Sequence, residues 1–427
     1  MKIKILLLVF VCLVAWPHLV RAQESPRDLV AAGQYQDARH ALVRIVAGRA
    51  DKALHLAYLE GLIAAHAGDR PKAIETFRTI LRAAPQFLPA RRELVVLLAA
   101  EGRNRSAVYH AEHLAAATTD RRLRERLQAY IRAENKRKPN GYALRFSIAP
   151  TTNVNNGTEA QEVIIGGIPF EVDPDSRAKA GARISAGVTG WAGRQLGPKL
   201  RGIATLSLDH AITTPGGASD TTLRGQAELI APLRNGRARL SFGPYLEAKF
   251  SAGDLARRRT GVVLNYQQTA GKAGQFGASL DLHRQSFPLA SYRDGRRLKG
   301  KLSFRKLVNA SRAFSVALPF EVEQTCRAHL DHRKLGVRLG WEQQWRGGLA
   351  TDVELSLDAD RFRGNYPGFA FPRQDDVFGI EISARHSKWA LGAFAPEISY
   401  SYTRASSSID FFDYESHGVG VSLSSRF

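Results

Sequence analysis

The stretch LGVRLGWE at Leu335–Glu342 decides the fold class of the larger part of the chain. Apolar Leu335, Val337, Leu339 and Trp341 alternate with small or charged residues, which is the period of a β-strand with one apolar face. The same alternation recurs in fourteen stretches, beginning near residues 142, 177, 200, 222, 237, 261, 275, 298, 314, 333, 349, 376, 391 and 415. An even number of such strands predicts an antiparallel barrel that crosses an outer membrane.

The connections between these stretches are predicted to alternate in length. The gaps near 151–176, 211–220, 251–260, 287–296, 363–375 and 405–414 are long, whereas Asn235-Gly236 and Gly347-Gly348 are typical of tight hairpins. Short turns at one end and long loops at the other favour the membrane barrel over a soluble β-sandwich, which would alternate along its strands as well. The last strand ends at Phe427, a terminal aromatic residue that we expect the barrel-insertion machinery to recognise.

Residues 23–138 contain a repeat with a helical period. The segments AAGQYQDA, HAGDRPKA and AEGRNRSA lie 35 and then 34 residues apart, the period of a tetratricopeptide helix–turn–helix unit. Each places a glycine five residues before an alanine: Gly33 and Ala38, Gly68 and Ala73, Gly102 and Ala107. These residues define the repeat, because glycine closes a turn and alanine lets paired helices approach. The sequence therefore predicts an α + β protein of two domains, an all-α tetratricopeptide solenoid followed by the barrel.

The N-terminus carries the pattern of a secretory signal peptide. Lys2 and Lys4 precede an apolar run at 5–16, and Val20-Arg21-Ala22 resembles a cleavage site. The run is too short to span a bilayer of about 30 Å. We predict a signal peptide at 1–22, a periplasmic repeat domain at 23–138 and an outer-membrane barrel at 139–427.

Positive charge is in excess, but it is not concentrated in a tail. The chain has 61 Lys and Arg against 40 Asp and Glu, a formal charge of +21, and its spread gives no support for a nucleic-acid partner. Several charges alternate with apolar residues on the predicted strands and are candidates for the lumen. They are Arg145, Arg183, Arg224, Glu228, Arg239 and Glu247. Such side chains either line a path for a passing molecule or pair across the lumen and stiffen it.

Motifs for enzymatic chemistry are missing from the sequence. We find no HExxH, CxxC, GxxxxGK[ST] or GxSxG pattern. We therefore expect no catalytic residues, no cofactor and no metal, and a protein that is not an enzyme.

The order of domains resembles the surface lipoprotein assembly modifiers, outer-membrane proteins of type 11 secretion. The most specific parts are Pro89–Leu94 (PARREL), Ala149-Pro150 and the Asn-rich segment Asn153-Val154-Asn155-Asn156 after the first strand. The resemblance implies a translocator that moves client proteins, surface lipoproteins or small secreted proteins, from periplasm to cell surface. We also expect barrel-assembly machinery, periplasmic chaperones and outer-membrane lipid as partners. Asn153, Asn155 and Asn156 would contact the client or hydrogen-bond the backbone of their own loop.

Two other transport functions remain open from the residues alone. A polysaccharide exporter also joins periplasmic repeats to a barrel, but it predicts a longer repeat array and a strongly cationic lumen. A passive diffusion porin would give no reason for attached repeats.

Overall fold

The computed structural model describes residues 25–137, 140–271, 273–386, 389 and 394–424. The predicted signal peptide and Phe427 lie outside the described residues. The described chain begins with α1 (Pro26–Ala31), α2 (Tyr35–Ile45), α3 (Lys52–His66), α4 (Arg70–Ala83), α5 (Leu88–Ala100), α6 (Asn104–Ala117) and α7 (Arg121–Arg137). None of the described helices combines the length and the hydropathy needed to cross a bilayer.

The chain divides into two compact units, residues 1–76 and 77–427. In the first unit, Leu29 and Val30 of α1, Leu42 of α2 and Leu59 of α3 are buried. The second unit holds the end of α4, helices α5 to α7 and all the strands. The change from helix to strand falls between residues 137 and 141, whereas the units divide within α4. The predicted domain boundary at 138 stays a prediction.

Three helix–helix turns repeat the same local structure. Gly33, Gly68 and Gly102 all have a φ between 70° and 85°, a left-handed conformation that glycine adopts without strain. After each glycine, a backbone N–H donates to the carbonyl five residues earlier, from Gln34 to Leu29, from Asp69 to Ala64 and from Arg103 to Leu98. This is the glycine C-cap of a helix. Ala38, Ala73 and Ala107 are fully buried. The repeat is thus present in the helices, while its assignment as tetratricopeptide stays a prediction.

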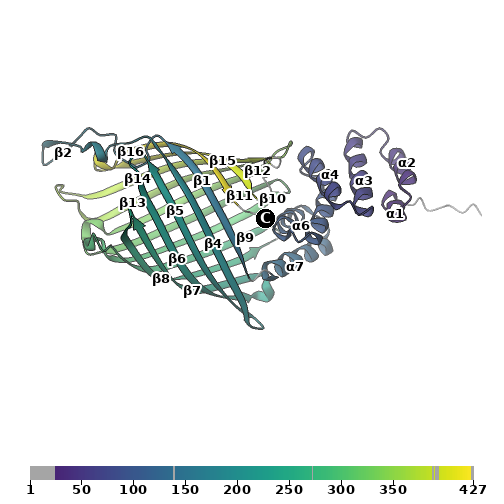
Figure 1. Ribbon diagram of the computed structural model, residues 1–427, viewed down its shortest axis with the longest axis horizontal. Coiled ribbons are helices and arrows are strands. Elements are labelled where there is room, and N and C mark those ends of the chain that lie inside the picture. The colour runs from purple at the N-terminus through teal and green to yellow at the C-terminus, as the bar shows by residue number, and fades with distance from the viewer. Residues whose placement is uncertain (1–24, 138–139, 272, 387–388, 390–393, 425–427) are drawn as a thin grey trace, which may run out of the picture. The chain divides into compact units, whose positions relative to one another are not determined.

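The fold class predicted from the sequence is confirmed, because the helices are followed by a closed antiparallel barrel of fourteen strands (Figure 1). Each strand pairs with the next along the chain, and the first strand pairs with the last to close the barrel. The strands are β1 (Gly141–Thr151), β4 (Gly181–Gly197), β5 (Leu200–Thr214), β6 (Ala218–Leu233), β7 (Ala238–Ser251), β8 (Asp254–Ala270), β9 (Gly274–Ser286), β10 (Gly295–Asn309), β11 (Arg312–Thr325), β12 (His332–Gln344), β13 (Leu349–Asn365), β14 (Pro372–His386), β15 (Ala395–Ser407) and β16 (Tyr414–Ser424). A hairpin of β2 (Glu162–Ile165) and β3 (Ile168–Glu171) stands in the loop after β1.

The two faces of each strand differ in polarity, as β12 illustrates. Leu335, Val337, Leu339 and Trp341 are 68%, 37%, 47% and 42% exposed, whereas Arg338 of the other face is paired with Asp358 at 2.6 Å. Exposed apolar side chains in this arrangement face lipid, and paired charges face the lumen. The closed barrel with its apolar outer face is that of an outer-membrane protein.

The prediction of long loops is wrong at two of the connections. Strands β5 and β6 are joined by residues 215–217 alone, and β7 and β8 by Ala252-Gly253. The pairs Thr213–Ala218 and Ser251–Asp254 bring the strands together right up to the turns. Residues 211–214, 218–220, 251 and 254–260, which were predicted to lie in these loops, instead continue the strands. The loops at 152–180, 287–294, 326–331, 366–371 and 408–413 lie at this same end.

Candidate functional site

The predicted lumen charges are held by polar partners one or two strands away in the closed barrel. Arg145 donates to Asp209 at 2.7 Å, and Arg183 lies 3.7 Å from Asp220. Arg239 donates to Gln267 at 2.6 Å, and Glu228 accepts from Asn265 at 3.4 Å. Pairing across strands accounts for these four residues, which supports a stiffening role for them.

Glu247 is the centre of an uneven charge cluster. Its carboxylate lies 3.5 Å from Arg224, 3.2 Å from Arg257 and 3.3 Å from Arg259. The guanidinium of Arg224 also stacks over the ring of Tyr245, 3.7 Å from its centroid. Three cations therefore share one nearly buried carboxylate, which leaves this sector of the lumen positive. Arg257 and Arg259 were not predicted from the sequence. The only signal for them was their spacing of two residues, which places both side chains on one face of a strand.

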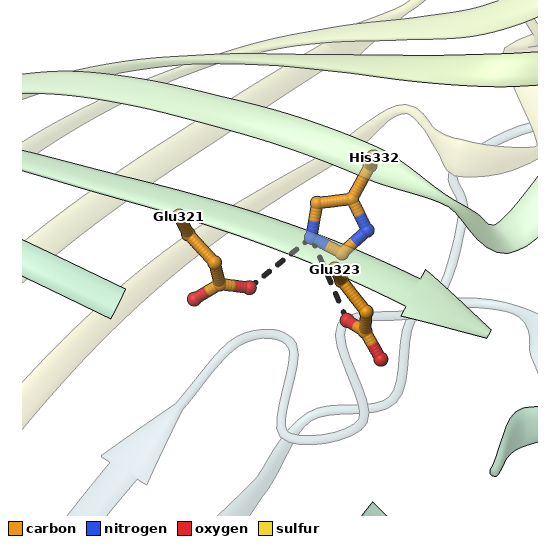
Figure 2. Close-up of side chains that lie close together, drawn as sticks. All are labelled: Glu321, Glu323 and His332. Carbon is orange, nitrogen blue, oxygen red and sulfur yellow. Dashed lines mark hydrogen bonds and ion pairs between the residues drawn. The ribbon is translucent and has the colours of Figure 1, made fainter. Parts of the chain in front are cut away.

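A second cluster at the long-loop end brings Glu321 and Glu323 of β11 next to His332 of β12 (Figure 2). His332 Nε2 lies 3.1 Å from Glu321 and 3.7 Å from Glu323, and 4.0 Å from Asp360 of β13. One histidine and two carboxylates form a donor set that metal ions use. This cluster could not be predicted from the sequence, because the histidine and the carboxylates come from different strands.

Cations already occupy the carboxylates of this cluster. Arg297 forms ion pairs with both Glu321 and Glu323, Lys299 lies 3.1 Å from Glu321, and Lys334 lies 3.4 Å from Asp360. Three side-chain cations thus balance three carboxylates, and a divalent ion would have to displace Arg297. The arrangement is that of an ion-pair network across β10 to β13 that stiffens the barrel wall.

The Asn-rich segment uses its side chains within its own loop. Asn153 is buried; its Nδ2 donates to the carbonyl of Gly157 at 2.8 Å and to that of Glu415 at 3.1 Å. Its Oδ1 accepts from the N–H of Gly157 at 2.8 Å. Asn155 donates to the carbonyl of Arg177 at 2.8 Å, and Asn156 has a φ of 49°, which asparagine tolerates better than most residues. These contacts favour the local structural role.

Within the second unit, helices contact the short-turn end of the barrel through buried polar groups. Arg91 of α5 is only 1% exposed; it donates to the carbonyl of Pro85 at 2.7 Å and to Gln344 at the end of β12 at 3.4 Å. Gln86 donates to Ser311, between β10 and β11, at 2.6 Å. Arg91 belongs to the segment PARREL on which the family resemblance partly rests. The structure gives that segment a position at the junction of helix and barrel.

Helix α6 adds aromatic and imidazole groups to this junction. Tyr109 hydrogen-bonds Gln344, and its ring lies 4.6 Å from that of His113. Burial lowers the pKa of His113 to about 3 and holds the pKa of His110 well below its usual value. Both imidazoles are therefore neutral at neutral pH. Burial and the nearby positive charge of Arg91 both disfavour the protonated form.

Comparison with known proteins finds a family whose sequences are similar to this chain. Residues 223–427, the barrel from β6 to its last strand, match the family model described as surface lipoprotein assembly modifier. The chain is related to the surface lipoprotein assembly modifiers. The resemblance predicted from the sequence is confirmed, since curated relatives match as well.

Two of these relatives come from Haemophilus influenzae. The chain is 21% identical to surface lipoprotein assembly modifier 1 of strain Rd over 208 residues, which cover 45% of this chain and 41% of that protein. It is 19% identical to the surface lipoprotein assembly modifier of strain 86-028NP over 381 residues, 87% of this chain and 76% of the relative. The first match therefore spans less than half of the relative's length.

Solved outer-membrane barrels are similar to this chain at a lower sequence identity. The outer membrane channel DcaP of Acinetobacter baumannii is 10% identical, with a TM-score of 0.41, over 67% of this chain and 97% of the channel.

Proposed function

We propose that this protein moves client proteins, above all surface lipoproteins, from the periplasm to the cell surface. The observation that carries the proposal is its relationship to the surface lipoprotein assembly modifiers. In this function the repeats would recruit the client in the periplasm, and the barrel would provide or gate its passage.

The helix–barrel junction supports this division of labour. Arg91, Gln86 and Tyr109 hold helices against the short-turn end of the barrel, and short turns lie on the periplasmic side in outer-membrane barrels. A client bound by these helices would be at the mouth of the barrel. The partners we propose are the client, the barrel-assembly machinery and periplasmic chaperones.

The lumen supports transport without chemistry. Its charged groups are engaged in pairs such as Arg145–Asp209 and Arg338–Asp358, and paired groups of this kind hold a wall in place. We propose that the protein is not an enzyme and needs no cofactor.

One observation favours a second candidate, the export of an acidic polysaccharide. Glu247 faces Arg224, Arg257 and Arg259, and this excess of positive charge would attract an acidic polymer. The remaining lumen pairs described above are balanced, so the protein client remains the better supported cargo.

A comparison of cells with and without the gene tests the proposal. Surface-exposed, secreted and periplasmic proteins are quantified by mass spectrometry, with surface polysaccharide measured in the same cells. We expect one or a few lipoproteins to disappear from the surface and to accumulate in the periplasm. An unchanged protein profile with loss of polysaccharide would transfer the function to the second candidate, and no change in either would contradict both.

A further inference from the structure

Five arginines form a row on the outer face of the barrel at its long-loop end. The row consists of Arg258 of β8, Arg284 of β9, Arg296 of β10, Arg333 of β12 and Arg361 of β13. All five are exposed. Charged side chains on the outside of a membrane barrel are unusual, because that face is in contact with lipid.

The strand register places the row on the lipid-facing side. On β9, Arg284 shares its face with Leu280 and Leu282, which are 41% and 52% exposed. On β12, Arg333 shares its face with Leu335 and Val337. Residues two apart on a strand point the same way, so each arginine lies at the outer border of the apolar band.

Like charges stand directly opposite one another in this row. Arg284 pairs in register with Arg296, and Arg333 pairs with Arg361. Within the described part of the chain, Arg361 is bound by Asp376 at 2.6 Å, whereas the side chains of Arg258, Arg284, Arg296 and Arg333 form no ion pair or hydrogen bond. Opposed like charges destabilise a sheet. An anion from outside the chain would remove the repulsion.

The height of the row identifies the kind of anion that is available. The arginines lie within a few residues of the loops at 287–294, 326–331 and 366–371, and long loops lie on the extracellular side in outer-membrane barrels. At that height the barrel is surrounded by the headgroups of the outer leaflet. The barrel's apolar band continues directly into the row, so a lipid whose chains pack on Leu282 and Leu335 would bring its headgroup to the arginines.

We propose that the arginine row binds the phosphate groups of a phosphorylated outer-leaflet lipid. A guanidinium offers two parallel N–H donors to a phosphate, and one phosphate between Arg284 and Arg296 would turn a repulsive pair into two attractive contacts. Arg333 adds a further guanidinium without an ion pair to the row, while its register partner Arg361 is already paired with Asp376. This site is separate from the lumen and does not depend on the proposed transport function.

The test uses native mass spectrometry of the purified full-length protein in detergent. It measures the binding of lipid A, which serves as the phosphorylated lipid probe. The variant is Arg284→Gln/Arg296→Gln/Arg333→Gln. The matched control is Arg194→Gln, because Arg194 of β4 is also exposed and on the lipid-facing side but stands at the short-turn end. We expect the triple variant to bind diphosphorylated lipid A about tenfold more weakly, and Arg194→Gln to bind it as the unaltered protein does. Equal binding by the triple variant, or an equal loss in the control, would overturn the proposal.

A second measurement on the unaltered protein keeps the proposal testable if the triple variant does not fold. Diphosphorylated lipid A, the same lipid with its phosphates removed, and inorganic phosphate are compared as ligands. We expect tight binding of the first, about tenfold weaker binding of the second, and binding of the first that weakens as salt is raised. Equal binding of the two lipids would show that the arginines do not recognise phosphate and would overturn the proposal. Binding of inorganic phosphate as tightly as lipid A would replace the lipid by a free anion and overturn the proposal.

Discussion

The guanidinium of Arg91 in α5 donates to the side-chain oxygen of Gln344, at the end of β12, over 3.4 Å. The two residues are 253 positions apart, and the contact joins the helical part of the second unit to the short-turn end of the barrel. Arg91 is buried almost completely, so its donors have no access to bulk water. We therefore expect the polar contacts at this junction to hold the helices in place.

Replacement of Arg91 tests the strength of the junction. Arg91→Ala removes the donor to Pro85 and Gln344 and leaves their oxygens buried, which we expect to cost about 1–3 kcal/mol. Hydrogen exchange of the α5 and α6 amides measures the loss. The control is Arg92→Ala, since Arg92 is half-exposed and pairs with its neighbour Glu93 at 3.1 Å; we expect about 0–1 kcal/mol. Equal protection of α5 in both variants would show that Arg91 does not hold the junction.

Acid should loosen α6. The folded pKa of His113 is about 3, below its ordinary value of 6.5, and that of His110 is lowered as well. The folded state therefore binds fewer protons, and the contribution of these histidines to stability is complete above pH 6.5 and is lost as pH falls from 6.5 towards 3. Glu112 has a raised pKa, so its protonation works in the opposite direction, but the two histidines have the larger shifts.

Hydrogen exchange of α6 at several pH values, corrected for the intrinsic rate, checks this dependence. We expect protection to fall between pH 6.5 and 5, and the fall to be smaller in His113→Asn, which removes one titrating group. The same fall in His113→Asn as in the unaltered protein would exclude His113 as its source.

Glu247 should be important for the stability of the barrel. Glu247→Gln leaves Arg224, Arg257 and Arg259 without their common counter-charge. We expect a loss of about 1–3 kcal/mol, because mutual repulsion of the three cations is no longer offset. The temperature at which the barrel unfolds in detergent measures it. Glu171→Gln serves as the control, because Glu171 is 80% exposed where it pairs with Arg177 and should contribute about 0–1 kcal/mol. A barrel that unfolds at the same temperature in both variants would contradict the account of this cluster.

The loop after β1 should depend on Asn153 more than on Asn156. Asn153→Ala removes three hydrogen bonds to the backbone of Gly157 and Glu415, at a cost of about 1–3 kcal/mol. Asn156→Gly places glycine where φ is already 49° and should leave the loop as it is. Limited proteolysis within 152–180 distinguishes the two. Export that fails in Asn153→Ala while the loop keeps its protection would instead favour contact with a client.

The barrel could be predicted from the sequence because the pattern that specifies it is local. Alternation such as that of Leu335 to Trp341 follows from contact with lipid on one face, and each strand carries it independently. The glycines at 33, 68 and 102 were equally visible, since a left-handed C-cap needs a particular residue at a particular place. The loops at 211–220 and 251–260 were predicted wrongly because polar residues at the ends of barrel strands resemble loop residues.

The clusters in the lumen could not be predicted, because they depend on register between strands. Arg257 and Arg259 meet Glu247 only through the pairing of β7 with β8, and His332 meets Glu321 only through that of β11 with β12. A shift of one residue would turn each of these side chains to the other face. The burial of Arg91 depends likewise on helices that pack against distant turns.

Reconstitution is the most direct test of the central claim, that this protein moves lipoproteins across the membrane. The purified full-length protein is inserted into liposomes with its N-terminal helices accessible, and a lipoprotein that the gene-deletion comparison identifies as lost from the cell surface is supplied on that side. We expect the lipoprotein to become protected from added protease as it crosses, and liposomes containing an unrelated barrel of similar size to leave it exposed. A lipoprotein that stays fully accessible to protease in the presence of the correctly folded protein would contradict the proposed translocation.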